Sequence, residues 1–121
     1  MSDIDVVVEK YLAAWSEPDP ATRRAALGDC CAADVHYVDP LADLTGVDAL
    51  NEAAGAAQGQ FPGFVFSLAG AIDAHHTVAR FSWQWGPPGE PAPVAGFDVL
   101  MLAPDGRIQT VVGFLDRMPT P

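Results

Sequence analysis

The sequence predicts an α+β fold in which helices come first and an antiparallel sheet follows. Two observations support this. Apolar residues recur at helical spacing in the N-terminal half, and from residue 64 onward apolar and polar residues follow a period of two. The length of 121 residues matches one domain, so residues 1–121 are taken as a single unit. The predicted order along the chain is α-α-β-α-β-β-β-β.

The first two helices are indicated by an apolar stripe and by prolines. Ser2 with Asp5 forms a capping pattern, and the stripe that follows predicts a helix from about Asp3 to Ser16. The segment Pro18-Asp19-Pro20 ends this helix and starts another, with Asp19 as its N-cap and Pro20 in its first turn. We expect the second helix to run from Ala21 to about Cys31.

A short strand and a third helix come next. Val35–Val38 is β-branched and aromatic, which predicts a strand, and Asp39-Pro40 ends it. The third helix opens at Thr45-Gly46-Val47-Asp48 and continues to about Gln60, although it contains helix-weakening glycines.

Four strands complete the predicted fold as a meander. Their expected ranges are Phe64–Ile72, Thr77–Trp85, Val94–Leu102 and Arg107–Asp116. Segments rich in Gly and Pro separate the last three strands, as turns require. We expect a strongly curved antiparallel sheet with a long helix across its concave face, which together form a cone with an internal cavity.

Composition and charge exclude several classes of protein. The chain has 16 acidic and 6 basic residues, a formal net charge of −10, whereas nucleic-acid binders need basic patches. The same charge would be repelled by an anionic membrane surface. No stretch approaches the roughly 18 apolar residues of a membrane span, and the first residues lack a signal-peptide pattern. We therefore expect a cytoplasmic protein that binds neither nucleic acid nor a membrane.

The cysteines and histidines do not form a recognisable metal-binding pattern. Cys30 and Cys31 are adjacent and cannot connect distant loops, so they are interpreted as two partly buried thiols. His36, His75 and His76 are too few and too scattered to form a convincing ligand set. We expect no metal ion.

One predicted strand carries a row of aromatic residues on a single face. Phe81, Trp83 and Trp85 alternate with polar residues, so all three point to the same side of the sheet. Such a row fits a hydrophobic core or a dimer interface, and it also fits the wall of a ligand cavity.

Three polar residues stand in apolar surroundings. Tyr11 lies on the apolar stripe of the first helix, Asp39 ends the first strand, and Asp98 lies between Phe97 and Val99 in an apolar strand. A carboxylate in such a strand is costly unless it is exposed, paired or protonated. Each residue also has a purely structural interpretation: a buried hydrogen bond for Tyr11, a turn before proline for Asp39, and a solvent-facing position for Asp98.

Five short segments, spread over nearly the whole chain, carry a resemblance to a known family. They are Lys10-Tyr11-Leu12, Ala33-Asp34, Asp39-Pro40, Gly96-Phe97-Asp98 and Pro104-Asp105-Gly106-Arg107. Their order and spacing resemble the ketosteroid isomerases, within the wider superfamily of SnoaL-like and nuclear-transport-factor-two-like cone folds. The resemblance implies a cystatin-like α+β barrel.

The resemblance also implies an isomerase that needs no cofactor. Asp39 would be the general base that takes a proton α to a carbonyl, and Tyr11 and Asp98 would form the oxyanion hole for the resulting enolate. The substrate would be a small hydrophobic carbonyl compound, and the protein a homodimer formed through the sheet. The expected substrate-binding residues are Trp15, Phe66, Phe81, Trp83 and Val111.

Two positions depart from the ketosteroid isomerases, and other functions remain open. Cys31 and Ala54 stand where that family has tyrosines supporting the catalytic tyrosine. A SnoaL-like polyketide cyclase would also act through an enolate, and the same fold could serve as a non-catalytic domain for small-molecule binding or dimerisation. In a domain that has lost its chemistry, Tyr11 and Asp98 would bond to each other.

Overall fold

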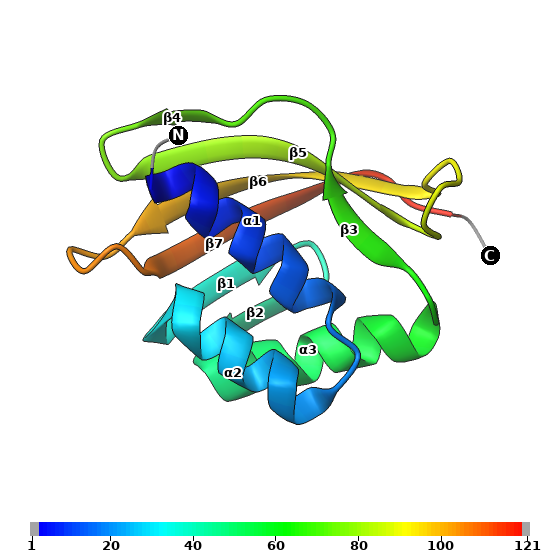
Figure 1. The fold of residues 1–121 in the computed structure, drawn as a ribbon, viewed down its shortest axis with the longest axis horizontal. Coiled ribbons are helices and arrows are strands. Elements are labelled where there is room, and N and C mark those ends of the chain that lie inside the picture. Colours follow the sequence, from blue (N-terminus) through cyan, green and yellow to red (C-terminus); the bar gives the residue numbers. More distant parts are fainter. Residues whose placement is uncertain (1–2, 120–121) are drawn as a thin grey trace.

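The computed structural model describes residues 3–119 and confirms the α+β class (Figure 1). The helices are α1 (Asp3–Ser16), α2 (Pro20–Cys30) and α3 (Val47–Gln60). The strands are β1 (Cys31–Asp39), β2 (Ala42–Thr45), β3 (Val65–Leu68), β4 (Asp73–His75), β5 (Val78–Gly86), β6 (Val94–Leu102) and β7 (Ile108–Arg117). Within residues 3–119, no helix is long and apolar enough to cross a membrane.

The three helices lie close to their predicted bounds. α1 has the predicted range, and Ser2, the predicted cap, lies outside the described residues. Asp19 caps α2, since its Oδ2 accepts hydrogen bonds from the backbone N–H and the hydroxyl of Thr22 at 2.8 and 2.7 Å. α2 ends one residue earlier than predicted because Cys31 already has an extended backbone and begins β1.

The strands differ from the prediction in the first half of the sheet. β1 begins at Cys31 rather than Val35, because the chain passes from α2 directly into a strand that pairs with β7. β2 was not predicted; it forms a hairpin with β1. The strand predicted over residues 64–72 is instead β3, followed by an irregular segment, and the separate β4 comes next. β3 and β4 pair with opposite ends of β5.

The sheet is mixed rather than wholly antiparallel. Its strand order is β2-β1-β7-β6-β5-β3, with β4 also paired to β5, and β1 runs parallel to β7 while the other pairs are antiparallel. β2 and β3 are the ends of this order and do not pair with each other, so the sheet curls without closing into a barrel. The parallel pairing joins the first long strand to the last, which local sequence patterns do not reveal.

The helices cover the inner face of the curled sheet. In Figure 1, α1 crosses this face, while α2 and α3 lie together near β1 and β2. The predicted alternation along β5 is confirmed: Phe81, Trp83 and Trp85 are buried, whereas Arg80 and Gln84 are exposed. The core therefore lies between the helices and the inner face.

A buried arginine fixes α2 against its neighbours. Arg23, only 4% exposed, donates from Nε to Asn51 Oδ1 of α3 at 2.6 Å and from Nη1 to the Glu17 carbonyl after α1 at 3.2 Å. Gly55 of α3 leaves room for this guanidinium, since a Cβ at that position would lie 2.8 Å from Arg23 Nη2. Gln58 adds hydrogen bonds from α3 to the carbonyls of Trp15 and Glu17, so the end of α1 is held in place.

Replacing Gly55 should reveal the importance of this arginine. Gly55→Ala is expected to lower the free energy of unfolding by about 1–3 kcal/mol, because the added methyl group displaces Arg23. Gly59→Ala in the same helix is the matched control: a Cβ there meets nothing within 4 Å. It should raise stability by about 0.5–1 kcal/mol through helix propensity. Urea unfolding measures both; effects of the same sign would contradict this account of Arg23.

Candidate active site

A cavity of about 290 Å³ lies between α1, α3 and the inner face of the sheet. Its wall is mostly apolar and aromatic, and α3 contributes the small residues Ala53, Ala56 and Ala57. The lining residues of β5 and β7 lie in the second half of each strand, and those of β6 lie in its first half. The cavity therefore occupies one end of the sheet, and packed side chains fill the other.

The three residues predicted to be catalytic all line this cavity. Tyr11 comes from α1, Asp39 from the end of β1, and Asp98 from the middle of β6. A fourth polar residue, Tyr37 of β1, lies in the same wall. The structure thus brings together groups that are distant in the sequence, while their catalytic roles stay predictions.

Asp98 is buried, which excludes the interpretation that it faces solvent. Its side chain is 7% exposed, and Trp83 Nε1 donates a hydrogen bond to Asp98 Oδ1 at 3.0 Å. Burial raises the pKa of Asp98 to about 7; the Trp83 hydrogen bond opposes this shift, and the nearby Asp39 carboxylate adds to it. A substantial fraction of Asp98 is therefore protonated at neutral pH and can donate a hydrogen bond.

Two glycines make room for this arrangement. Gly96 lies opposite Trp83 in the β5–β6 pair, and a Cβ at Gly96 would overlap the indole ring. Gly113 lies opposite Asp98 in the β6–β7 pair, and a Cβ there would lie 2.9 Å from Asp98 Oδ1 and 3.3 Å from Asp39 Cβ. The missing side chains allow the indole to reach Asp98 and the two carboxyl groups to flank β7.

Asp39 both holds a turn and lines the cavity. Its Oδ1 accepts hydrogen bonds from the backbone N–H groups of Leu41 and Ala42 at 2.8 and 2.9 Å. Its Oδ2 accepts a hydrogen bond of 2.5 Å from the Tyr37 hydroxyl. Tyr37 was not among the predicted site residues. The signal that could have identified it is strand alternation, since residues two apart in β1 share a face with Asp39.

The Tyr11 hydroxyl is buried without a partner. Tyr11 is 2% exposed, and its oxygen has no hydrogen-bond partner in the part of the chain that the structure describes. A Tyr11–Asp98 hydrogen bond was expected for a domain that has lost its chemistry, and the structure does not contain this bond. Burial raises the pKa of Tyr11 well above its ordinary value, and the negative charge of Asp98 adds to this effect. The phenol therefore stays protonated and available as a donor.

The predicted substrate-binding residues divide into two groups. Trp15, Phe66 and Trp83 line the cavity, and Phe66 contacts both tryptophans, with ring centroids 5.7 Å from Trp15 and 5.2 Å from Trp83. Phe81 and Val111 do not line it. Both are completely buried in the core, because they lie toward the filled end of the inner face.

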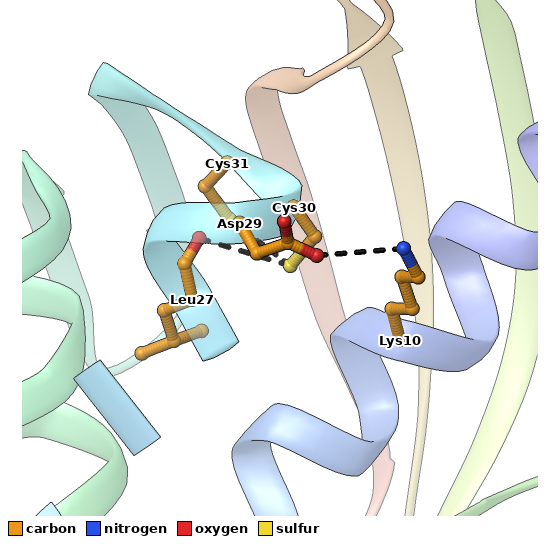
Figure 2. Close-up of polar contacts among 5 residues, drawn as sticks. All are labelled: Lys10, Leu27, Asp29, Cys30 and Cys31. Carbon is orange, nitrogen blue, oxygen red and sulfur yellow. Dashed lines mark hydrogen bonds and ion pairs between the residues drawn. The ribbon is translucent and has the colours of Figure 1, made fainter. Parts of the chain in front are cut away.

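The two cysteines lie outside the cavity lining, at the junction of α2 and β1 (Figure 2). Their Sγ atoms are 3.8 Å apart, and Cys30 Sγ also contacts the Leu27 carbonyl at 3.8 Å. Both thiols are free and buried, and the contact with Cys30 together with burial raises the pKa of Cys31. Beside them, Lys10 and Asp29 form an exposed ion pair of 3.4 Å. These thiols therefore belong to the packing of α2 on β1.

The histidines are exposed on the protein surface. His36 points away from the inner face and forms a 2.7 Å contact with Asp43 of β2. Among the described residues, no cluster of three or more His, Cys, Asp or Glu side chains is placed to hold a metal ion.

Comparison with known proteins relates this chain to a family and to solved structures. The model of the SnoaL-like domain matches residues 8–111. A structure from Agrobacterium tumefaciens, provisionally named an isomerase of the SnoaL-like family, is 40% identical, with a TM-score of 0.89 and coverage of 96% of this chain and 99% of that one. None of the curated proteins compared with the chain matches it.

Two further structures are similar in fold alone. A protein from Sinorhizobium meliloti, provisionally named a polyketide cyclase, is 22% identical over 93% of this chain and 99% of its own, with a TM-score of 0.70. A protein of unknown function with a cystatin-like fold from Methylobium petroleophilum is 15% identical, covering 98% of this chain and 78% of that one, with a TM-score of 0.75.

Asp98→Asn should change how stability depends on pH. Folding raises the pKa of Asp98 from 3.8 to about 7, so the folded state binds this proton more tightly than the unfolded state. The resulting stabilisation is fully present below about pH 4 and is lost as the pH rises to about 7, a decline of at most about 4 kcal/mol. The Asn variant should lack this decline in urea unfolding between these pH values.

The matched control is Asp116→Asn, which removes an exposed carboxylate from β7. It should keep the pH dependence of the wild-type protein. An Asp98→Asn variant with the same decline as the wild type would contradict the raised pKa of Asp98.

Proposed function

The chain belongs to the SnoaL-like family, and on that basis we propose that it is an enzyme that isomerises a small hydrophobic carbonyl compound by proton transfer, without a cofactor. The observation that carries this proposal is the unpartnered Tyr11 hydroxyl in an apolar cavity that is also lined by the buried Asp98 and the half-buried Asp39. A ligand oxygen placed there would satisfy the buried donor.

Asp39 is the proposed general base. Its carboxylate takes the proton from the carbon α to the carbonyl, and the electron pair of the broken C–H bond moves toward the carbonyl oxygen. The same carboxylic acid then returns the proton further along the conjugated system. One proton leaves and one is added, so the reaction requires no external acid, oxidant or reductant.

Tyr11 and Asp98 are the proposed donors to the enolate oxygen. Tyr11 is neutral at all relevant pH values, and Asp98 can donate only while it is protonated. Burial favours that neutral form of Asp98. Asp39 instead accepts three hydrogen bonds, which hold its carboxyl group in place. The two acids are thus suited to opposite roles.

The aromatic wall supports this chemistry by limiting water. Trp15, Phe66 and Trp83 surround the polar groups with apolar surface. Hydrogen bonds to a developing negative charge are stronger in such a site than in water, because the local dielectric constant is lower. A hydrophobic substrate would also gain free energy by leaving water.

Asp39→Asn should abolish turnover of a β,γ-unsaturated ketone. We expect kcat to fall by roughly 100- to 10,000-fold, the range for loss of a general base. The conjugated product is followed by its ultraviolet absorbance. Binding of a phenol, measured through the fluorescence of Trp15 and Trp83, should persist in this variant and weaken in Asp98→Ala.

Two results would change the assignment. Undiminished turnover in Asp39→Asn would remove Asp39 as the base. Phenol binding by a wild-type protein that isomerises no β,γ-unsaturated ketone would favour the alternative of a non-catalytic binding domain.

We further propose that the protein is a homodimer through the outer face of its sheet. This face carries Phe97 opposite Phe114 and Val99 opposite Val112 on β6 and β7. Phe114 is 53% exposed and Met101 is 42% exposed. The charged residue next to this patch, Arg80 opposite Val99, is paired with Asp73. With a net charge of −10, two copies would approach most easily through such an apolar patch.

Val99→Lys should therefore convert the dimer into monomers, because it places a charge on each copy at the centre of this surface. Sedimentation equilibrium measures the mass. Thr77→Lys, at an exposed turn before β5, is the control and should leave the mass unchanged. A monomeric wild-type protein would contradict the proposal.

A further inference from the structure

The hydrogen bonds around Asp39 leave very little of its carboxylate free. A carboxylate has about four acceptor positions, two on each oxygen. The backbone N–H groups of Leu41 and Ala42 take both positions on Oδ1, at 2.8 and 2.9 Å. The Tyr37 hydroxyl takes one position on Oδ2. A single position on Oδ2 therefore remains for a proton from the cavity.

Tyr37 is held rigidly beside this oxygen. It is buried, and its ring lies 5.5 Å from that of Trp15, centroid to centroid. It lies two residues before Asp39 in the same strand, so both side chains project from one face of β1. Its hydroxyl donates over 2.5 Å, at the short end of the range for a bond between a hydroxyl and a carboxylate.

We infer that Tyr37 is a positioning residue for the proposed base, and that Asp39 Oδ2 is the atom that accepts the substrate proton. The inference rests on the proposed function and adds to it a residue and an atom. The Oδ1 bonds fix the plane of the carboxylate through the turn, and the Tyr37 bond occupies one side of Oδ2. The one remaining acceptor position on Oδ2 therefore has a fixed direction.

The Tyr37 hydrogen bond also favours return of the proton. It ends on a full negative charge before proton transfer and on a neutral acid afterwards, so it is stronger in the first state. Proton uptake at Oδ2 weakens the bond, and delivery of the proton to the product restores it. The C–H bond that breaks and the C–H bond that forms use the same oxygen, so the base is regenerated.

Few other titratable groups surround this pair. Asp98 of β6 interacts electrostatically with both Tyr37 and Asp39, and Tyr11 of α1 interacts with Tyr37. Burial raises the pKa of Tyr37, and the hydrogen bond to Asp39 raises it further, so Tyr37 remains a donor throughout the cycle. Replacing Tyr37 leaves Asp98 and Tyr11 in place. An effect of the replacement on Asp39 can therefore be assigned to the lost Tyr37 hydroxyl.

Tyr37→Phe tests the inference because it removes the hydroxyl and keeps the ring. By NMR, the wild-type protein should show a far-downfield proton from the short hydrogen bond, and the variant should lack it. The ¹³C chemical shift of the labelled Asp39 carboxyl should also differ in the variant, since Oδ2 has lost a hydrogen-bond donor. Both readouts are independent of turnover.

Kinetics give the second arm of the test. Tyr37→Phe should lower kcat roughly tenfold or more through misplacement of the base while KM stays near its wild-type value. Tyr11→Phe removes the other tyrosine of the chain and is the matched control. It should lose turnover and phenol binding but keep the downfield proton and the wild-type Asp39 carboxyl shift.

The results separate this inference from the function on which it rests. If the wild-type protein isomerises the ketone and Tyr37→Phe changes neither the Asp39 carboxyl shift nor kcat, the role of Tyr37 is overturned. If the downfield proton and the Asp39 carboxyl shift respond as expected but the wild-type protein turns over no ketone, the proposed function is overturned and the Tyr37–Asp39 pairing stands.

Discussion

The hydrogen bond from the Trp83 indole to the buried Asp98 carboxyl is the contact around which the cavity is organised. A carboxyl group in an apolar strand is destabilising unless it is neutral or paired, and here burial and one hydrogen bond are balanced so that its pKa lies near 7. The bond requires Gly96, because any side chain there would occupy the space of the indole. An aromatic residue and a glycine in adjacent strands thus supply the one hydrogen bond that opposes the effect of burial on this acid.

The fold brings the remaining polar groups to this acid from two directions. The parallel pairing of β1 with β7 places Asp39 beside Gly113, on the other side of β7 from Asp98. α1 supplies Tyr11, and the end of this helix is held by hydrogen bonds from Arg23 and Gln58. The buried arginine is distant from any chemistry, yet it helps to decide where the Tyr11 helix lies.

The proposals share one physical theme, which is that the cavity treats its two carboxyl groups differently. Asp39 accepts three hydrogen bonds, whereas Asp98 accepts one and has little contact with water. The tyrosines are divided in the same way: Tyr37 is bonded to Asp39, and the Tyr11 hydroxyl has no partner among the described residues. The proposals assign the proton acceptor and the hydrogen-bond donors to these differently surrounded groups.

Local patterns in the sequence determined the helices, the β5–β6–β7 meander and the unusual polar residues, because periodicity, caps and turn residues act over a few positions. The resemblance to the ketosteroid isomerases, rather than these patterns, predicted that Tyr11, Asp39 and Asp98 would share a cavity, and all three line it. Only the tertiary structure decided the parallel β1–β7 pair, the extra strand β2, the core positions of Phe81 and Val111, and the bond between Tyr37 and Asp39. The pairing of β1 with β7 joins segments some seventy residues apart, and the location of the cavity depends on how closely helices and sheet pack at each end. These features follow from long-range contacts, which no short window of residues contains.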